Sequence, residues 1–163
     1  ATGMRPSEWI ALERRDIDRE NGIAVVQRSY SRGTLRPYGK TQRSRRSVPL
    51  SRMALDALAA IPPRIDSPLV FPSANGGLID LHNWRAREWK PALEAAGIGH
   101  GTIYTMRHTF ATNAIGAGIG LFELARYMGT SVDMLDRVYG HLVAGAEQVA
   151  RAKLDAAAGR SGV

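Results

Sequence analysis

Apolar residues recur at helical spacing over most of this 163-residue chain, and that spacing predicts a mainly helical protein. Ser51 and Asp80 are residue types that cap helices, and Pro91 is expected to bend or restart the helix that follows Asp80. The helices expected from the pattern cover about residues 6–15, 51–61, 80–93, 104–116, 120–128, 131–138 and 142–158.

Two short segments near the N-terminus have the composition of β-strands. An Asn-Gly pair at 21–22 favours a tight hairpin turn into the apolar residues 23–26, and residues 46–50 predict a short edge strand. Lys40 is expected at the tip or flank of the resulting β-hairpin, in a connection punctuated by Gly and Pro. The predicted fold class is therefore mainly α with a small antiparallel β-sheet near the N-terminus, an α+β domain.

The composition is that of one globular domain, with 44% hydrophobic and 23% charged residues. The chain has no cysteine, and its four histidines lack the paired spacing of a zinc motif, so we expect no metal site and no cofactor. No apolar run is long enough to span a bilayer, and no secretory pattern opens the chain. We therefore expect no membrane association and a cytoplasmic location, in a bacterium or a phage-infected host cell.

Positive charge is concentrated in one part of the chain. The net charge is +7, yet residues 21–55 contain no Asp or Glu. Such a stretch repels itself unless it is solvated or meets phosphates, so it predicts contact with DNA, and a solvated hairpin face is the alternative. The arginines expected to contact DNA are Arg28, Arg32, Arg36, Arg43, Arg45 and Arg46.

Four short motifs follow one another along the chain. Residues 2–8 read TGMRPSE, and residues 39–41 and 46–50 read GKT and RSVPL. Residues 104–112 read YTMRHTFAT, and residues 128–141 contain Met-Gly-Thr and then, nine residues after the threonine, Tyr-Gly-His. In this order they resemble the boxes T-G-L/M-R-x-x-E, G-K-T…R-x-V-P-L, H-x-L-R-H-T-F-A-T and L-G-H…Y-x-H of the tyrosine site-specific recombinases, the phage integrase family. Each motif alone is weak, but the joint pattern is specific and spans almost the whole chain.

Phosphodiester chemistry explains why these residue types belong together. Cleavage without a metal needs a nucleophile at phosphorus, cations for the non-bridging oxygens and an acid for the leaving oxygen. The resemblance assigns the nucleophile to Tyr139, the phosphate clamp to Arg5 and Arg107, and the general acid to Lys40. It also makes Glu8, one helical turn after Arg5, a supporting carboxylate.

Two positions depart from the family pattern. Tyr104 stands where the family has a histidine that helps to take the nucleophile's proton, and a phenol is a poorer base near neutral pH. Thr130 stands where the family has His or Trp, and its hydroxyl can still donate to a phosphate oxygen. His108 and His141 are candidates for supporting roles, although a helix turns His108 roughly 100° away from Arg107.

The resemblance further implies what the chain belongs to. It implies that residues 1–163 are a catalytic-domain fragment of a recombinase or integrase, without the first helix and the N-terminal DNA-clamping domain of the family. It implies cleavage and rejoining of double-stranded DNA through a 3′-phosphotyrosyl intermediate. The implied assembly is a tetramer on two duplexes, in which the helix after the tyrosine docks onto a neighbour.

Three other functions remain open from the sequence. Tyr104 and Thr130 in place of imidazoles are compatible with a DNA-binding relative that has lost cleavage. A type IB topoisomerase-like enzyme uses similar chemistry, and a basic helical module for protein contacts would have the same charge balance.

Single residues also have ordinary structural explanations. A tyrosine near a helix end usually packs, and an arginine usually forms an ion pair or lies at the surface. Trp84, Trp89 and Phe110 are expected in the core, and Met134 and Val138 on the apolar face of the helix that carries them.

Overall fold

In the computed structural model, the residues described are 2–37, 45–143 and 146–160. Helices dominate, and a small antiparallel sheet lies near the N-terminus, which confirms the predicted fold class. The α-helices are α1 (Pro6–Trp9), α2 (Arg52–Ala59), α3 (Leu81–Trp84), α4 (Lys90–Ala95), α5 (Ile103–Gly116), α6 (Leu121–Met128), α7 (Val132–Tyr139) and α8 (Ala146–Arg160). Shorter helical turns are η1 (Arg14–Asp16), η2 (Arg85–Trp89) and η3 (Gly140–Val143). The strands are β1 (Ile17–Asp18), β2 (Ile23–Val26), β3 (Arg28–Ser31), β4 (Thr34–Pro37) and β5 (Arg46–Pro49).

The main sheet is built around β2. Its strand order is β1-β2-β5, with both pairs antiparallel, and Ala24 of β2 lies opposite Val48 of β5. Gly22 has a φ of 62°, which the predicted turn before β2 requires. The predicted strands 23–26 and 46–50 are thus confirmed, with β5 at a sheet edge.

A second hairpin, β3–β4, was not predicted from the sequence. Its turn residues Arg32 and Gly33 both have positive φ values, 51° and 75°, as tight hairpin turns require. Every residue of β4 is exposed. The segment therefore lacks the alternation of buried and exposed positions that would have indicated a strand.

The first helix is shorter than predicted. It ends at Trp9, because the following residues leave the helix to hydrogen-bond to the segment at 68–70. The amide of Val70 donates to the carbonyl of Leu12 at 2.9 Å, and the amide of Arg14 donates to that of Pro68 at 2.9 Å. The helical spacing of apolar residues does not reveal this competing pairing with a distant segment.

The predicted bend at Pro91 takes the form of the π-helical turn η2 just before it. Proline has no amide hydrogen to donate and crowds the preceding turn, so the ladder of hydrogen bonds widens there. Trp84 and Trp89, which bracket this turn, stack at 6.0 Å between ring centroids. Both are only partly buried, so they cover the core instead of lying inside it.

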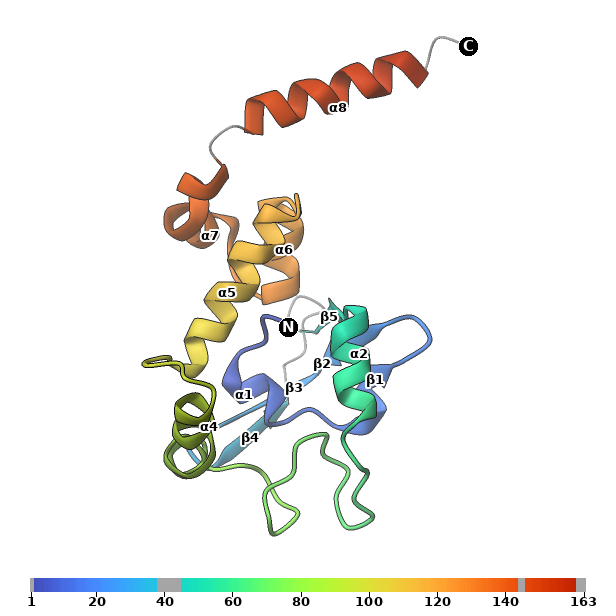
Figure 1. The fold of residues 1–163 in the computed structure, drawn as a ribbon. Helices are drawn as coiled ribbons and strands as arrows, with labels where there is room; N and C mark the ends of the chain where they lie inside the picture. The colour runs from blue at the N-terminus through green and yellow to red at the C-terminus, as the bar shows by residue number, and fades with distance from the viewer. Residues whose placement is uncertain (1, 38–44, 144–145, 161–163) are drawn as a thin grey trace.

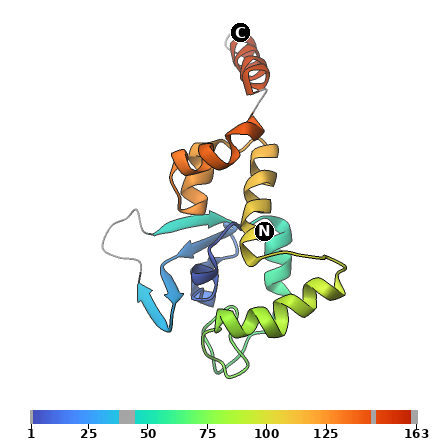
Figure 2. The ribbon, with the colours of Figure 1, turned by 90° about the vertical axis from the view of Figure 1, so that its left-hand side faces the viewer.

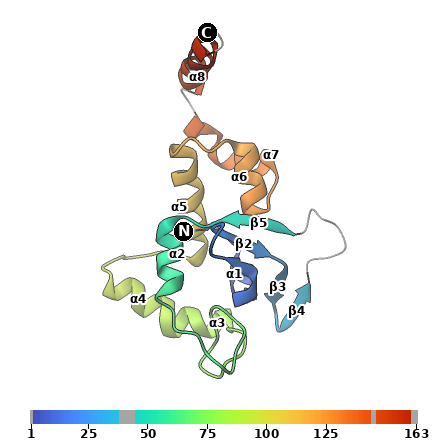
Figure 3. The same ribbon diagram turned by 90° about the vertical axis from the view of Figure 1, so that its right-hand side faces the viewer.

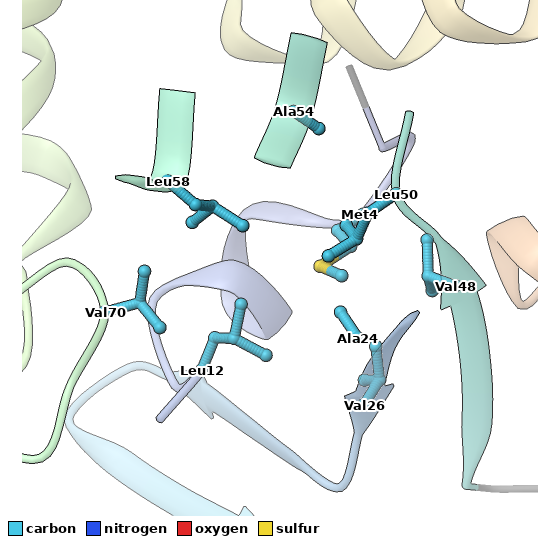
Figure 4. Close-up of a cluster of buried hydrophobic side chains, with 9 residues drawn as sticks. All are labelled: Met4, Leu12, Ala24, Val26, Val48, Leu50, Ala54, Leu58 and Val70. Atoms are coloured by element: carbon cyan, nitrogen blue, oxygen red, sulfur yellow. The ribbon is translucent and has the colours of Figure 1, made fainter. Parts of the chain in front are cut away.

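Two apolar clusters hold the fold together. In the first, shown in Figure 4, side chains from β2 and β5 pack against α2 and the segment around α1, with Ala24 and Val48 fully buried. The second joins α5, α6 and α7 around Leu124 and Leu135 and includes Tyr139. On α7, Met134 and Val138 were predicted to face the core, but they are 43% and 39% exposed. Leu135 and Tyr139 alone are buried on that helix.

The helices α5, α6 and α7 form one group beside the edge strand β5, as Figures 1 and 3 show. In all three views, α8 stands away from the rest of the chain (Figures 1, 2 and 3). Among the residues described, no helix combines the length and apolar character needed to cross a membrane.

Candidate active site

Tyr139 meets a histidine at the contact between α5 and α7. It is the last residue of α7, and its side chain is 7% exposed within the second apolar cluster. Its hydroxyl oxygen lies 2.6 Å from Nδ1 of His108, a hydrogen-bond distance. The tyrosine therefore has a buried ring and a hydroxyl that faces an ionisable group.

Arg107, the residue before His108 on α5, brings positive charge to the same place. Its guanidinium donates to the carbonyl of Gly3 and, at 2.9 Å, to the carbonyl of Met128. Burial, followed by the charges of Arg5 and Arg46, lowers the pKa of Arg107, although an arginine stays charged in proteins. Burial raises the pKa of Tyr139 and outweighs the opposing effect of the Arg107 charge.

Arg5 caps the first helix and reaches across to the end of α6. Its main-chain amide donates to Glu8 at 2.7 Å, and its guanidinium donates to the same carboxylate at 3.0 Å and to the carbonyl of Gly129. A residue near the N-terminus is thereby tied to one that is 124 positions later.

Glu8 is 1% exposed and holds a second arginine besides Arg5. Arg46 of β5 binds both of its oxygens, at 2.9 Å and 2.6 Å, and also donates to the carbonyl of Tyr127 at 2.9 Å. Burial alone would raise the pKa of Glu8, but the hydrogen bond and charge of Arg46, and then those of Arg5, bring that pKa below its ordinary value. Glu8 is therefore ionised at neutral pH.

The three arginines converge on the C-terminal end of α6. Successive carbonyls of Tyr127, Met128 and Gly129 accept from Arg46, Arg107 and Arg5, respectively. The last carbonyls of a helix have no partner within it and carry the negative end of its dipole, so cations are favoured there. This helix end positions guanidinium groups that come from distant parts of the sequence.

Gly129 makes that convergence possible, and we predict that Gly129→Ala is more destabilising than the same change at another left-handed glycine. Gly129 has a φ of 63°, and an added Cβ would lie 2.7 Å from Cζ of Arg46. Gly118 has a φ of 83° and open space around it. Gly118→Ala should cost about 1–2 kcal/mol for its backbone conformation alone. Gly129→Ala should cost about 1–3 kcal/mol more, because Arg46 must shift. Urea denaturation of both variants measures the difference, and equal losses would contradict the prediction.

The arrangement has an excess of positive charge that suits a phosphate. Arg5, Arg46 and Arg107 interact electrostatically around the single carboxylate of Glu8. Each guanidinium has five N–H donors, and Arg107 directs two of them to carbonyls within the described part of the chain. These guanidinium groups can therefore be held in place by the protein and still offer donors to a ligand.

The other residues predicted for the site lie at different depths. Tyr104 is 47% exposed, lies in the first turn of α5 four residues before His108, and lines a hollow of about 390 Å³ with Arg32 and His82. Thr130 is partly buried in the turn between α6 and α7, and His141 is exposed in η3. Lys40 and Arg43 lie outside the described residues. In the described part of the chain, no group of three or more His, Cys, Asp or Glu could hold a metal ion.

The arginines of the basic stretch fall into two groups. Arg46 and Arg28 are engaged in ion pairs: Arg46 with Glu8, and Arg28 with the buried Asp16 and, at 3.4 Å, with Glu13. Their side chains are 11% and 15% exposed, so these ion pairs are largely shielded from bulk water. The exposed members of the stretch in the described residues include Arg32, Arg36 and Arg45.

Two features of the site were missed from the sequence. The contact of His108 with the hydroxyl of Tyr139 was not predicted, because the angle between His108 and Arg107 on a helix says nothing of Tyr139. Its position one turn after Tyr104 was the available signal, since residues four apart share a helix face. The carbonyl cluster at the end of α6 has no sequence signal apart from Gly129.

Comparisons of this chain with known proteins agree on one family. A family model described as "Phage integrase family" matches residues 1–144. "Tyrosine recombinase XerC" of Corynebacterium efficiens is 29% identical over 142 residues, covering 87% of this chain and 43% of that protein. "Tyrosine recombinase XerC" of Herpetosiphon aurantiacus is 30% identical over 152 residues, covering 87% and 45%. The chain thus spans less than half the length of these curated relatives.

A solved structure has the same fold. The Tn1549 transposon integrase, determined in complex with circular intermediate DNA, superposes with a TM-score of 0.73 at 23% identity, covering 94% of this chain and 56% of that one. The fold is therefore shared over most of this chain at a low level of sequence identity.

Proposed function

This chain belongs to the phage integrase family, and from that premise we propose that it forms the catalytic part of a site-specific recombinase that cuts and rejoins DNA through Tyr139. The family resemblance in the four motifs is confirmed by the family match and by relatives named tyrosine recombinases. The relatives are more than twice as long as the matched segment, so the activity of the whole protein is part of the proposal.

In the proposed reaction, the hydroxyl of Tyr139 attacks a backbone phosphorus and forms a 3′-phosphotyrosyl bond. The bond from phosphorus to the 5′ oxygen breaks, and Lys40 protonates that oxygen as it leaves. Arg5 and Arg107 balance the charge that grows on the non-bridging oxygens, and Thr130 adds a hydrogen bond. The energy of the broken bond is kept in the protein–DNA link, so rejoining needs no ATP.

One observation carries the proposal: the end of α6 gathers Arg5, Arg46 and Arg107, and the hydroxyl of Tyr139 hydrogen-bonds to His108, the residue next to Arg107. A single ion pair would explain one of these arginines. Three guanidinium groups around one carboxylate leave an excess of positive charge beside a phenol. This combination suits a phosphodiester better than a neutral or cationic ligand.

Double-stranded DNA is the proposed partner. The Tn1549 transposon integrase is described in complex with DNA, and the exposed Arg32, Arg36 and Arg45 give this chain cations for backbone phosphates. The protein would act in the cytoplasm, where bacterial and phage DNA is found.

A nicked suicide substrate tests the proposal. The full-length protein is incubated with a duplex that carries the attachment sequence of its own genetic element, nicked beside the cleavage point so that the cut fragment leaves. A denaturant-stable adduct is expected, with the modified peptide mapped by mass spectrometry to Tyr139. DNA binding without any adduct would reject cleavage and favour a non-cleaving relative. No binding to the duplex at low salt, where contacts to backbone phosphates are strongest, would reject DNA as the partner.

We also propose that four protomers act together and that α8 of one protomer docks on the next. Leu154 of α8 is 70% exposed, and α8 stands apart from its own chain (Figures 1 and 2). A lone helix of this length is marginal in water, so it needs a partner. An apolar hollow of about 530 Å³, which includes the exposed Met53, Ile98 and Met106, is the proposed acceptor.

Leu154→Asp is expected to weaken this assembly without stopping cleavage of a single site. Losing one buried leucine contact corresponds to about 1.5–3 kcal/mol, or roughly ten- to a hundredfold in affinity. Sedimentation velocity on DNA with two sites measures the complex. Arg151→Ala is the control, because the side chain of Arg151 is 86% exposed on the same helix. Unchanged assembly in Leu154→Asp would contradict α8 docking.

A further inference from the structure

We infer that His108 is the group that takes the proton from Tyr139 when the tyrosine attacks phosphorus. This inference rests on the proposed function and deepens it, because it assigns the base in a chain where the usual histidine position is Tyr104. It follows from the contact between α5 and α7.

The geometry is that of an acid and its base. Nδ1 of His108 lies 2.6 Å from the hydroxyl oxygen of Tyr139, within the range for direct proton transfer. The two rings are tilted by 52° with centroids 5.9 Å apart, so the contact joins polar atoms and is not a ring stack. A bare Nδ1 accepts the phenol hydrogen, and Nε2 then carries the imidazole's own hydrogen.

His108 lies on the same helix face as Tyr104, the position where the family has a histidine. It lies four residues after Tyr104 on α5, so the two side chains project from the same face one turn apart. An imidazole accepts protons near neutral pH, whereas a phenol does not. A base placed one turn further along α5 can therefore serve the same reacting atom.

The surroundings of Tyr139 make a base necessary. Its ring is buried, and burial raises the pKa of its hydroxyl, so the phenol stays neutral at physiological pH. His108 is exposed, so a proton that it accepts can pass on to water. Arg107 precedes His108 on α5, and its positive charge opposes that rise in the pKa of Tyr139 and so favours the phenoxide as it forms.

The step balances. The Tyr139 oxygen forms a bond to phosphorus and loses its proton to Nδ1 of His108. The bond between phosphorus and the 5′ oxygen breaks, and that oxygen gains a proton from the general acid, proposed above as Lys40. In rejoining, the 5′ hydroxyl attacks phosphorus, and the imidazolium returns its proton to the departing phenoxide.

The kinetic test compares His108→Gln with wild type on the nicked suicide substrate, using the full-length protein. Glutamine can hydrogen-bond to the hydroxyl but cannot take its proton. The rate of adduct formation is expected to fall about 10²–10⁴-fold, the usual contribution of a general base. His100→Gln is the matched control, because His100 is an exposed histidine in the connection between α4 and α5, and it should react at the wild-type rate.

A more acidic nucleophile separates a base from a structural residue. 3-Fluorotyrosine at position 139 has a more acidic phenol, which loses its proton more readily. The fall in the rate of adduct formation caused by His108→Gln should therefore shrink severalfold. A residue that only positions the ring would cause the same loss with both nucleophiles. A substrate with sulfur at the 5′ bridging position, which needs no leaving-group acid, should restore a Lys40→Ala variant but not His108→Gln.

The outcomes separate this inference from the proposed function. If wild type forms no adduct, the proposed function fails. If wild type reacts and His108→Gln matches it, or loses equally with both nucleophiles, the inference is overturned. A second measurement needs no cleavage: the nitrogen NMR shifts of His108 in the 163-residue chain, assigned with His108→Gln. Neutral imidazole with hydrogen on Nε2 supports the inference, and hydrogen on Nδ1 overturns it.

Discussion

Tyr139→Phe is expected to abolish the covalent protein–DNA adduct completely while leaving the chain folded. Phenylalanine keeps the ring that packs among α5, α6 and α7 but has no oxygen to attack phosphorus. The change removes one hydrogen bond, to His108, which is worth about 0.5–1.5 kcal/mol in stability. Loss of activity should therefore greatly exceed loss of stability.

Adduct formation on a denaturing gel and urea denaturation measure the two effects of Tyr139→Phe. Tyr127→Phe is the control, because it removes a phenol hydroxyl from α6 while the Tyr127 carbonyl, which accepts from Arg46, is unchanged. Tyr127→Phe should form the adduct at the wild-type rate. An adduct that persists in Tyr139→Phe would mean that another side chain is the nucleophile.

Much of the helical framework could be predicted because its signals are local. The helical patterns at 104–116, 120–128 and 131–138 correspond to α5, α6 and α7 within one residue at each end. Ser51 and Asp80 cap their helices by accepting from amides three residues later, at 3.3 Å and 2.8 Å. The hairpin β3–β4 escaped prediction, because its residues are mostly polar and its turn uses a positive φ at Arg32.

The site was only partly predictable because its contacts join distant segments. The motifs singled out Arg5, Arg107 and Tyr139, but nothing local indicates that the end of α6 gathers the arginines. The contact of Tyr139 with His108 depends on how α5 and α7 cross. Their roles in cleavage remain predictions that the adduct experiments test.

The basic stretch illustrates the same limit. Eight lysines and arginines without an acid between residues 21 and 55 indicate a solvated or phosphate-binding face. In the folded chain, Arg28 and Arg46 pair with carboxylates on other segments, Asp16 and Glu8, and their contact with DNA stays a prediction. Counting charges along the sequence cannot separate these two from Arg36, because the pairing partners are brought in by the fold.

Glu8→Gln should produce the largest loss of stability, because Glu8 is 1% exposed and holds two guanidinium groups. The glutamine amide has the shape of the carboxylate but no charge. Its N–H donors would face the N–H donors of Arg46, whose side chain is 11% exposed. Removing one partner of a buried pair costs about 3–5 kcal/mol. Urea denaturation at neutral pH measures the loss. Glu20→Gln, an exposed control near the β1–β2 turn, should be nearly neutral.

The same variant isolates the effect of pH. The pKa of Glu8 in the folded chain lies below its ordinary value of 4.5. Its ionisation therefore contributes stability that is present above 4.5 and is lost as pH falls through the folded pKa. The gap in unfolding free energy between wild type and Glu8→Gln should be widest at neutral pH and should narrow through this acid range. A gap that stays constant down to the acid unfolding of both proteins would show that the carboxylate charge contributes nothing.

Because Arg5 and Arg46 share this carboxylate, Glu8→Gln should also slow adduct formation at neutral pH, even at temperatures where the variant remains folded.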